Sequence, residues 1–372
     1  MNNIKKLENL EEKYDKLQSK IERMPLKIKR FHLESNLDSL NSCLQILGKE
    51  KIDETISDEY YDYVYRDSMK IIKDLYSNSD VLSQINNKLI YFYRDNNYYD
   101  DYSLYDNPVN SEKTFMLLEE FFKFLGNDVY SLYLDLKKNN HLFFVNDLSM
   151  EACCFDTSFQ DNDYIFTSNY KNDFQLVCNV CHEMGHAYQD YLLRNQTNFA
   201  TYNLYSEFFS LLFERIFCKY LVDNNLYQEE CCNDKLSCYN GLLYQTIAAE
   251  MINCSLAYNT ISYDDIYQEN YNNLCINQDL LQNFEELFDN DDGTLKWESQ
   301  VYVIDNILGS IFYRQIEKNF QQGFRNAKEF IMKAKYLDTR EVLLDCLDHL
   351  NYERDYIQEA IENKRSYQYI KR

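Results

Sequence analysis

The chain has 372 residues and a formal net charge of −23, and it is long enough for one large domain or two smaller ones. So acidic a surface repels nucleic acid and anionic membranes, and neither is expected as a partner. Only seven glycines and two prolines occur. Because these residues end helices and form tight turns, their scarcity predicts a mostly helical protein.

Two further features bear on where the protein resides. The N-terminal segment lacks the apolar core of a signal peptide and no run is long enough to span a bilayer, so we expect a cytoplasmic protein. The twelve cysteines follow no regular framework, so we expect reduced thiols. Cys178 and Cys181 precede a histidine pair, but four ligands so close together on one helix would face different directions. This argues against a structural zinc site of two cysteines and two histidines.

The first part of the chain is predicted to be helical, with two lobes. The expected helices cover residues 3–24, 34–48, 52–76, 80–95 and 110–126. The stretch 94–108 is polar and aromatic and ends in proline, so it is the expected boundary between lobes. We therefore expect an N-terminal helical lobe over 1–105 and a second region over 106–372.

The middle of the chain has a different pattern. Residues 141–145, 153–159 and 163–170 are short, aromatic and separated by turn residues, which is typical of strands in a small sheet. From residue 172 the pattern is helical again to the C-terminus, apart from an acidic loop at 289–294. The expected fold class is therefore mostly α with one small β-sheet.

The most informative motif is VCHEMGHAYQ, residues 180–189. His182 and His186 lie one helical turn apart, so both imidazoles can reach one zinc ion. Glu183 lies one step round the helix, where a carboxylate can take a proton from a zinc-activated water. The core face expected for this helix consists of Val177, Val180, Met184, Ala187 and Tyr191.

A third ligand is expected from YSEFFSLLFERIF, residues 205–217. This segment is apolar nearly all round and predicts a buried helix. Glu207, Ser210 and Glu214 stand at steps of three and four and line one stripe. Carboxylates on a buried helix are costly unless they are paired or bind a metal. The ordinary alternative is that Glu214 pairs with a basic residue and that Glu207 lies at an exposed end.

Together these motifs resemble a known family. HEMGHA (182–187), followed after a helix-length gap by EFFSLLFE (207–214), resembles the thimet oligopeptidase and oligoendopeptidase F family of zinc peptidases, and most of all its bacterial oligoendopeptidase F branch. Over about 109–330, further segments resemble that branch. Those similar to its β-region are 134–140, 151–159 and 163–170, and the one similar to its C-terminal active-site segment is 301–309.

The resemblance implies a bowl-shaped helical peptidase of zincin type with one Zn²⁺ per chain and oligopeptide substrates. It implies that His182, His186 and Glu207 bind the zinc. Glu183 would be the general base for the attacking water and then carry the proton to the leaving amine. Glu214 would fix the tautomer of a ligand histidine.

The resemblance also implies a substrate side of the site. Residues 163–170 would form an edge strand on which the extended peptide lies by strand addition. The contact residues on that strand would be Tyr164, Ile165, Phe166 and Thr167. Tyr302 matches a tyrosine whose phenol stabilises the tetrahedral oxyanion.

The chain departs from that branch mainly on the substrate side. The departures are Leu295 and Trp297 in place of a histidine and a tyrosine, Val303 and Asn306 in place of tyrosines, and Cys153 and Cys154 in place of paired glycines. Only 181 residues precede His182, which is a shorter helical region than the family usually has.

Three functions follow from these observations. The leading one is a zinc-dependent metallopeptidase that hydrolyses short oligopeptides with a metal-activated water. A second is a metallocarboxypeptidase of the carboxypeptidase Taq type, which the aromatic β-segment fits less well. The third is a metal-binding, peptide-binding protein with little or no catalysis, which Leu295 and Trp297 motivate.

Overall fold

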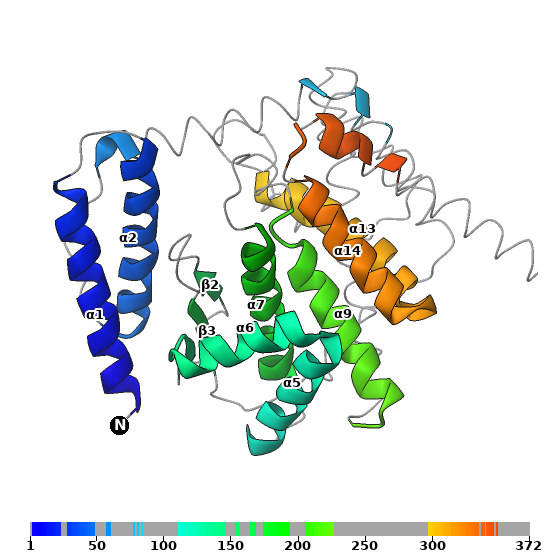
Figure 1. The fold of residues 1–372 in the computed structure, drawn as a ribbon, viewed down its shortest axis with the longest axis horizontal. Helices are drawn as coiled ribbons and strands as arrows, with labels where there is room; N and C mark the ends of the chain where they lie inside the picture. The colour runs from blue at the N-terminus through cyan, green and yellow to red at the C-terminus, as the bar shows by residue number, and fades with distance from the viewer. Residues whose placement is uncertain are drawn as a thin grey trace, which may run out of the picture. The chain divides into compact units, whose positions relative to one another are not determined.

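The part of the chain that the structure describes is mostly helical with one small sheet, and this confirms the expected fold class. The computed structural model describes residues 2–23, 28–48, 57–60, 77–78, 80–81, 84, 111–145, 153–155, 164–168, 174–193, 205–226, 297–334, 336–338, 340–345 and 347–348. Its main helices are α1 (Asn2–Ile21), α2 (Ile28–Ile46), α5 (Ser111–Leu125), α6 (Asn127–Lys138), α7 (Phe174–Leu193), α9 (Phe208–Asp223), α13 (Trp297–Lys318) and α14 (Phe320–Ala334) (Figure 1). The expected helices over 52–76 and 80–95, the boundary at 94–108 and the loop at 289–294 lie wholly or largely outside the described residues.

The residues cluster into two compact units that alternate along the sequence. The first unit comprises Met1–Lys70, Tyr102–Asn195 and Lys219–Asn224, and the second comprises Ile71–Asp101, Gln196–Cys218 and Asn225–Arg372. This grouping differs from the division at residue 105 that the sequence suggests, and that division remains a prediction.

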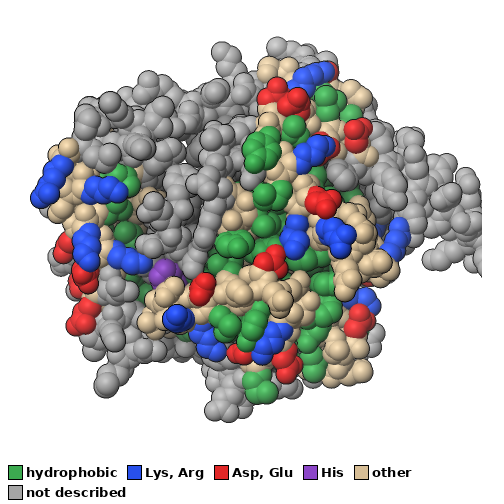
Figure 2. Space-filling view, in the orientation of Figure 1, with side chains coloured by type: hydrophobic (Ala, Val, Ile, Leu, Met, Phe, Trp, Pro, Cys, Tyr) green, Lys and Arg blue, Asp and Glu red, His purple; other side chains and the backbone are tan. Residues whose placement is uncertain are grey.

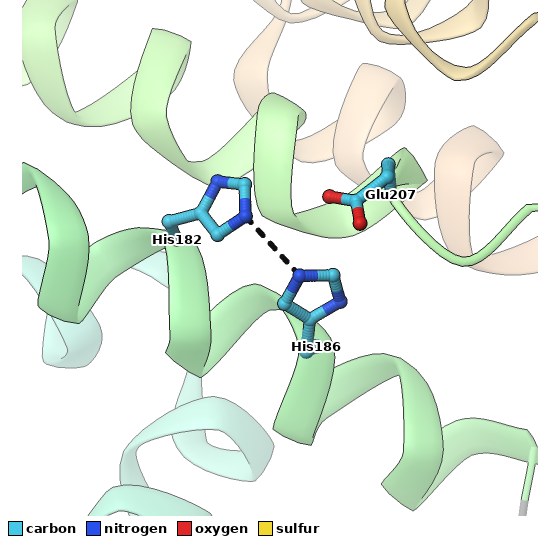
Figure 3. A group of neighbouring side chains, drawn as sticks. All are labelled: His182, His186 and Glu207. Atoms are coloured by element: carbon cyan, nitrogen blue, oxygen red, sulfur yellow. Dashed lines mark hydrogen bonds between the residues drawn. The ribbon is translucent and has the colours of Figure 1, made fainter. Parts of the chain in front are cut away.

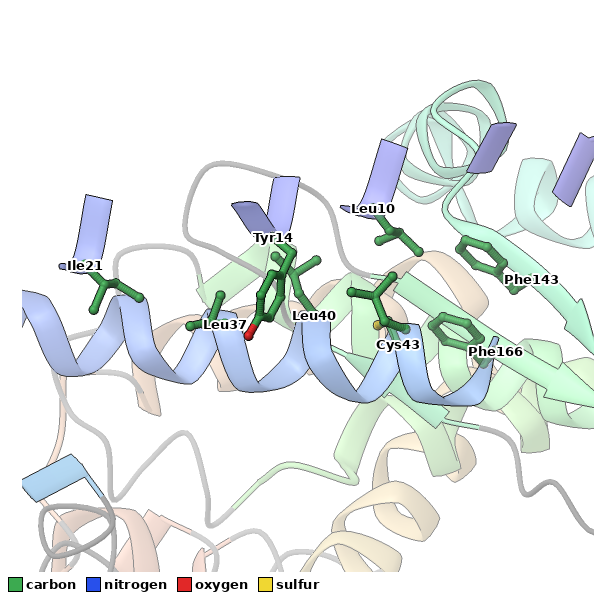
Figure 4. Packing of buried hydrophobic residues seen from close by; sticks show 9 residues of the cluster. Leu10, Tyr14, Ile21, Leu37, Leu40, Cys43, Phe143 and Phe166 are labelled. Carbon is green, nitrogen blue, oxygen red and sulfur yellow. The ribbon is translucent and has the colours of Figure 1, made fainter. Parts of the chain in front are cut away.

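In the first unit, α1 and α2 lie side by side and cover one face of the sheet. Their apolar residues recur at helical spacing, so each helix presents one stripe. The buried cluster consists of Leu10, Tyr14 and Ile21 from α1, Leu37, Leu40, Cys43 and Leu44 from α2, and Phe143 and Phe166 from the sheet (Figure 4). The rings of Phe143 and Phe166 stack with centroids 4.5 Å apart. Burial of each large apolar side chain contributes roughly 1.5–3 kcal/mol to the free energy of unfolding. The cluster therefore holds α1 and α2 against the sheet.

The predicted start of α2 at residue 34 is wrong, because the helix begins at Ile28. Residues 28–33 are IKRFHL, in which the apolar Ile28 and Phe31 stand three apart, a helical step. The lysine and arginine between them also favour helix, since their long side chains lose little rotamer freedom there.

The sheet has three strands in the order β1–β3–β2. Strands β1 (Leu142–Val145) and β3 (Tyr164–Ser168) are parallel, and β2 (Cys153–Phe155) pairs with β3 antiparallel. The expectation that 163–170 forms an edge strand is therefore wrong, because β3 is the central strand. Its adjacent residues Ile165 and Phe166 point to opposite faces and both are buried, which is the pattern of a strand covered on both faces.

Helices α5 and α6 follow each other with only Gly126 between them. Gly126 has φ 141°, a conformation that side chains disfavour and that allows the sharp change of direction. The family resemblance placed 134–140 in a β-region, but 134–138 is the end of α6. The buried residues of α6 follow a helical period, and they are Val129, Leu132, Tyr133 and Leu136.

In the second unit, α13 and α14 lie side by side and are joined through Asn319 (Figure 1). A Cβ on Gly323 of α14 would meet the backbone nitrogen of Ile316 at 2.5 Å, so glycine permits the close approach of the two helices. Aromatic rings fill the space between these helices and α9. The ring pairs Phe208–Phe312, Phe208–Phe330 and Phe312–Phe330 have centroids 5.4, 5.6 and 5.3 Å apart.

Charged side chains of both signs are interspersed over the described helices on the face in Figure 2. Several are paired along a helix at a four-residue step, as in Glu119–Lys123 and Lys219–Asp223. Among the described side chains on this face, the acidic residues therefore do not form one patch. None of the described helices is both long and apolar enough to cross a membrane.

Candidate metal centre

Helix α7 carries the histidine motif and packs against β2, β3, α5 and α6. Four of the five residues expected on its core face are buried, and these are Val177, Val180, Met184 and Ala187. The fifth prediction is wrong, because Tyr191 is 39% exposed and Tyr188 is fully buried instead. Tyr188 stands one helical turn after Met184 and so also fits the core face, and its hydroxyl donates a 2.6 Å hydrogen bond to Oδ2 of Asp128 on α6, which satisfies the polar end of the buried ring.

The two histidines face each other on one side of α7, as their spacing predicts. The Nε2 atoms of His182 and His186 are 3.1 Å apart, and the rings meet nearly at right angles, at 74° (Figure 3). Both side chains are half-buried. The helix therefore presents two imidazole nitrogens to one point in space.

Glu207 completes a group of three possible metal ligands with this pair. One ligand atom from each of His182, His186 and Glu207 lies within 4.8 Å of the others (Figure 3). Among the described residues, Cys178 and Cys181 are not part of this group, and both are fully buried.

Glu207 lies just before α9 rather than within a buried helix. Its carbonyl oxygen accepts the Leu211 N–H at 3.1 Å, so it occupies the N-cap position. The Ser210 hydroxyl lies 2.8 Å from that carbonyl oxygen and 2.9 Å from Oε2 of the Glu207 carboxylate. Ser210 therefore restrains one carboxylate oxygen and leaves Oε1 to other partners.

The donor set fits zinc. Two imidazoles and a carboxylate with an open fourth position are ligands of catalytic zinc sites. Nitrogens about 2.0–2.1 Å from a tetrahedral zinc ion stand about 3.3 Å from each other. The observed separation of the two Nε2 atoms, 3.1 Å, is close to that value, so little movement of α7 is needed to hold the ion.

Sequence reasoning missed Asp305, on α13. Its carboxylate is completely buried, and Oδ2 accepts the backbone N–H of Glu207 at 2.8 Å. Burial raises the pKa of Asp305 well above its usual range. The hydrogen bond from the Glu207 N–H lowers that pKa, and the nearby charge of Glu207 raises it further. The sequence signal was one acidic residue inside the apolar run VYVIDNILG, since a lone carboxylate in a buried stripe needs a polar partner.

The structure describes the side chains of only some of the remaining predicted site residues. Glu183 and Glu214 are buried on α7 and α9, and their roles remain predictions. Phe166 is packed in the cluster under α1 and α2, and Ile165 is also buried. The positions whose side chains lie outside the described residues are Tyr164, Thr167, Leu295, Trp297, Tyr302, Val303 and Asn306.

The comparisons with known proteins find distant structural neighbours. No family model matches the chain, and no curated protein matches it. A Bacillus anthracis str. Ames structure provisionally named oligoendopeptidase F is similar with 14% identity and a TM-score of 0.45, over 90% of this chain and 64% of that one. A provisionally named peptidase from Chlamydophila abortus gives 14% identity and a TM-score of 0.47, over 87% and 62% of the two chains.

Another structure provisionally named oligoendopeptidase F gives 14% identity and a TM-score of 0.42, over 87% of this chain and 65% of that one. Two of the three structures carry the provisional name oligoendopeptidase F. The chain spans less than two thirds of the length of each neighbour. A likeness at this level does not carry an activity from those proteins to this chain.

Proposed function

We propose that the protein is a zinc-dependent metallopeptidase that hydrolyses short oligopeptides in the cytoplasm. The observation that carries this proposal is the group of His182, His186 and Glu207, whose ligand atoms lie within 4.8 Å of one another. The HExxH arrangement on α7 supports hydrolysis in particular, because it adds a carboxylate next to a ligand but off the ligand face.

In the proposed mechanism, His182, His186 and Glu207 would hold the zinc, which when bound would supply polarisation of the scissile carbonyl and a lowered pKa of the attacking water. Glu183 accepts a proton from that water as its oxygen bonds to the carbonyl carbon. Glu183 then donates the proton to the amine nitrogen when the carbon–nitrogen bond breaks. Tyr302 is proposed to donate a hydrogen bond to the developing oxyanion, and Glu214 to fix the tautomer of a ligand histidine.

The substrate side needs a different arrangement from the one first expected. At Ile165 and Phe166, β3 is paired with both β1 and β2 through its backbone, so an added peptide strand has no free edge there. We therefore propose that a substrate contacts this strand through its side chains or at the end of the strand. The residues proposed for this contact are Tyr164, Ile165, Phe166 and Thr167. The buried state of Ile165 and Phe166 argues against direct contact by those two.

The test is hydrolysis of a mixed peptide library by the zinc-loaded full chain, with mass spectrometry of the products. We expect internal cleavage that stops when a chelator removes the metal and resumes when zinc is restored. Loss of only C-terminal residues would indicate the metallocarboxypeptidase instead. Zinc-dependent peptide binding without any cleavage would overturn the peptidase and support the metal-dependent peptide-binding protein.

A further inference from the structure

We propose that Asp305 is a positioning residue for the third metal ligand, holding the backbone of Glu207 in place from a separate helix. This inference rests on the proposed role of Glu207 in metal binding. Asp305 is not itself a ligand in this proposal. It acts through Glu207, by fixing where the side chain of Glu207 leaves the backbone.

The geometry gives Glu207 restraints from two directions. Ser210, one turn into α9, holds its carbonyl oxygen and Oε2. Asp305 holds its N–H from 98 positions further along the chain, at 2.8 Å. The first restraint is local to α9, whereas the second ties the ligand to α13, so of these two hydrogen-bonded restraints the second resists a shift of the whole N-terminus of α9.

The packing around Asp305 keeps that second restraint stiff. One turn further along α13, a Cβ on Gly309 would lie 3.0 Å from Nη1 of Arg215 and 3.9 Å from the Leu212 backbone nitrogen. Helix α13 thus approaches α9 closely just beyond the hydrogen bond. Phe208, the residue after Glu207, also packs edge-on against Phe312 of α13 with ring centroids 5.4 Å apart.

The burial of Asp305 also favours a role beyond ordinary helix capping. Its side chain is completely buried, and among the described residues Oδ1 has no hydrogen-bond partner. A buried carboxyl with an unsatisfied oxygen costs stability. Such a cost is expected where a group serves a site rather than the core. Partners that orient a ligand typically change metal affinity by about 10–100-fold when they are removed.

The test compares variants of the full-length protein by their affinity for zinc alone, measured by competition with a chromogenic chelator. Asp305→Ala removes the acceptor, and we expect zinc affinity to fall by about 10–100-fold. Asp305→Asn keeps an acceptor oxygen, and we expect affinity close to wild type. The d–d absorption of bound Co²⁺ should change in Asp305→Ala and not in Asp305→Asn.

Asp338→Ala is the matched control, because Asp338 Oδ1 also accepts a backbone N–H at the start of a helix, from Glu341 at 2.9 Å. We expect unchanged zinc affinity in that variant. Equal losses in Asp305→Ala and Asp338→Ala, or no loss in either, overturn the inference. If Asp305→Ala does not fold, a tenfold loss in Asp305→Asn overturns it too. Failure of the wild type to bind zinc instead overturns the proposed function.

Discussion

Replacing Tyr188 by phenylalanine removes one hydroxyl and leaves the buried ring in place. That hydroxyl donates a 2.6 Å hydrogen bond to Oδ2 of Asp128, and the bond ties α7, the helix of the histidine pair, to α6. A hydrogen bond to a charged group contributes about 1.5–3 kcal/mol. Asp128 is half-buried, so water can partly replace the donor. We therefore expect the free energy of unfolding to fall by about 1–2 kcal/mol.

Tyr133→Phe is the matched control on the neighbouring helix. Tyr133 is equally buried, but among the described residues its hydroxyl has no hydrogen-bond partner. Removing an unsatisfied buried hydroxyl is neutral or stabilising, so we expect a change within about 0.5 kcal/mol of zero, or a gain. Urea unfolding of both variants at pH 7 measures the difference. If Tyr133→Phe is destabilised as much as Tyr188→Phe, the loss comes from packing and the hydrogen-bond reasoning is refuted.

Three further predictions concern the ligands, the base and alkaline pH. Glu207→Gln should weaken zinc retention against a chelator, whereas Glu329→Gln, the same change at an exposed position of α14, should not. Glu183→Gln should keep its zinc and lose about 10²–10⁴-fold in kcat, with little change in KM; equal turnover with zinc bound would contradict the assigned base. Burial raises the pKa of Tyr133 to about 12, above about 10 in the unfolded chain. The contribution of Tyr133 to stability is therefore complete below about pH 10 and lost as pH rises towards 12. Urea unfolding across that range should show that the free energy of unfolding falls less steeply with pH in Tyr133→Phe than in wild type.

Much of the fold could be predicted because single elements depend on local patterns. The helices at 3–24 and 110–126 and the three strands were expected close to where α1, α5 and the sheet occur. Strand order was not predictable in the same way, since pairing depends on which segments meet in space. The burial of Ile165 and Phe166 on opposite faces of β3 is the pattern that would have indicated a central strand.

In the candidate site, too, the residues with a local sequence signal could be predicted and those that depend on distant contacts could not. The histidine pair followed from a four-residue step on one helix, and Glu207 from a carboxylate in an apolar segment. Asp305 did not, because its hydrogen-bond donor is a backbone N–H 98 positions away, and a backbone donor leaves no motif in the sequence. The role of Ser210 was equally hidden, since it depends on Glu207 being the N-cap of α9 rather than a residue inside it.

The most direct test of the central claim is a crystal structure of the zinc-loaded protein with anomalous data collected at the zinc absorption edge. The account predicts one strong anomalous peak per chain, about 2.0–2.2 Å from Nε2 of His182, from Nε2 of His186 and from a carboxylate oxygen of Glu207. A peak held by other residues, such as the cysteines of α7, or no peak at this group, would contradict it.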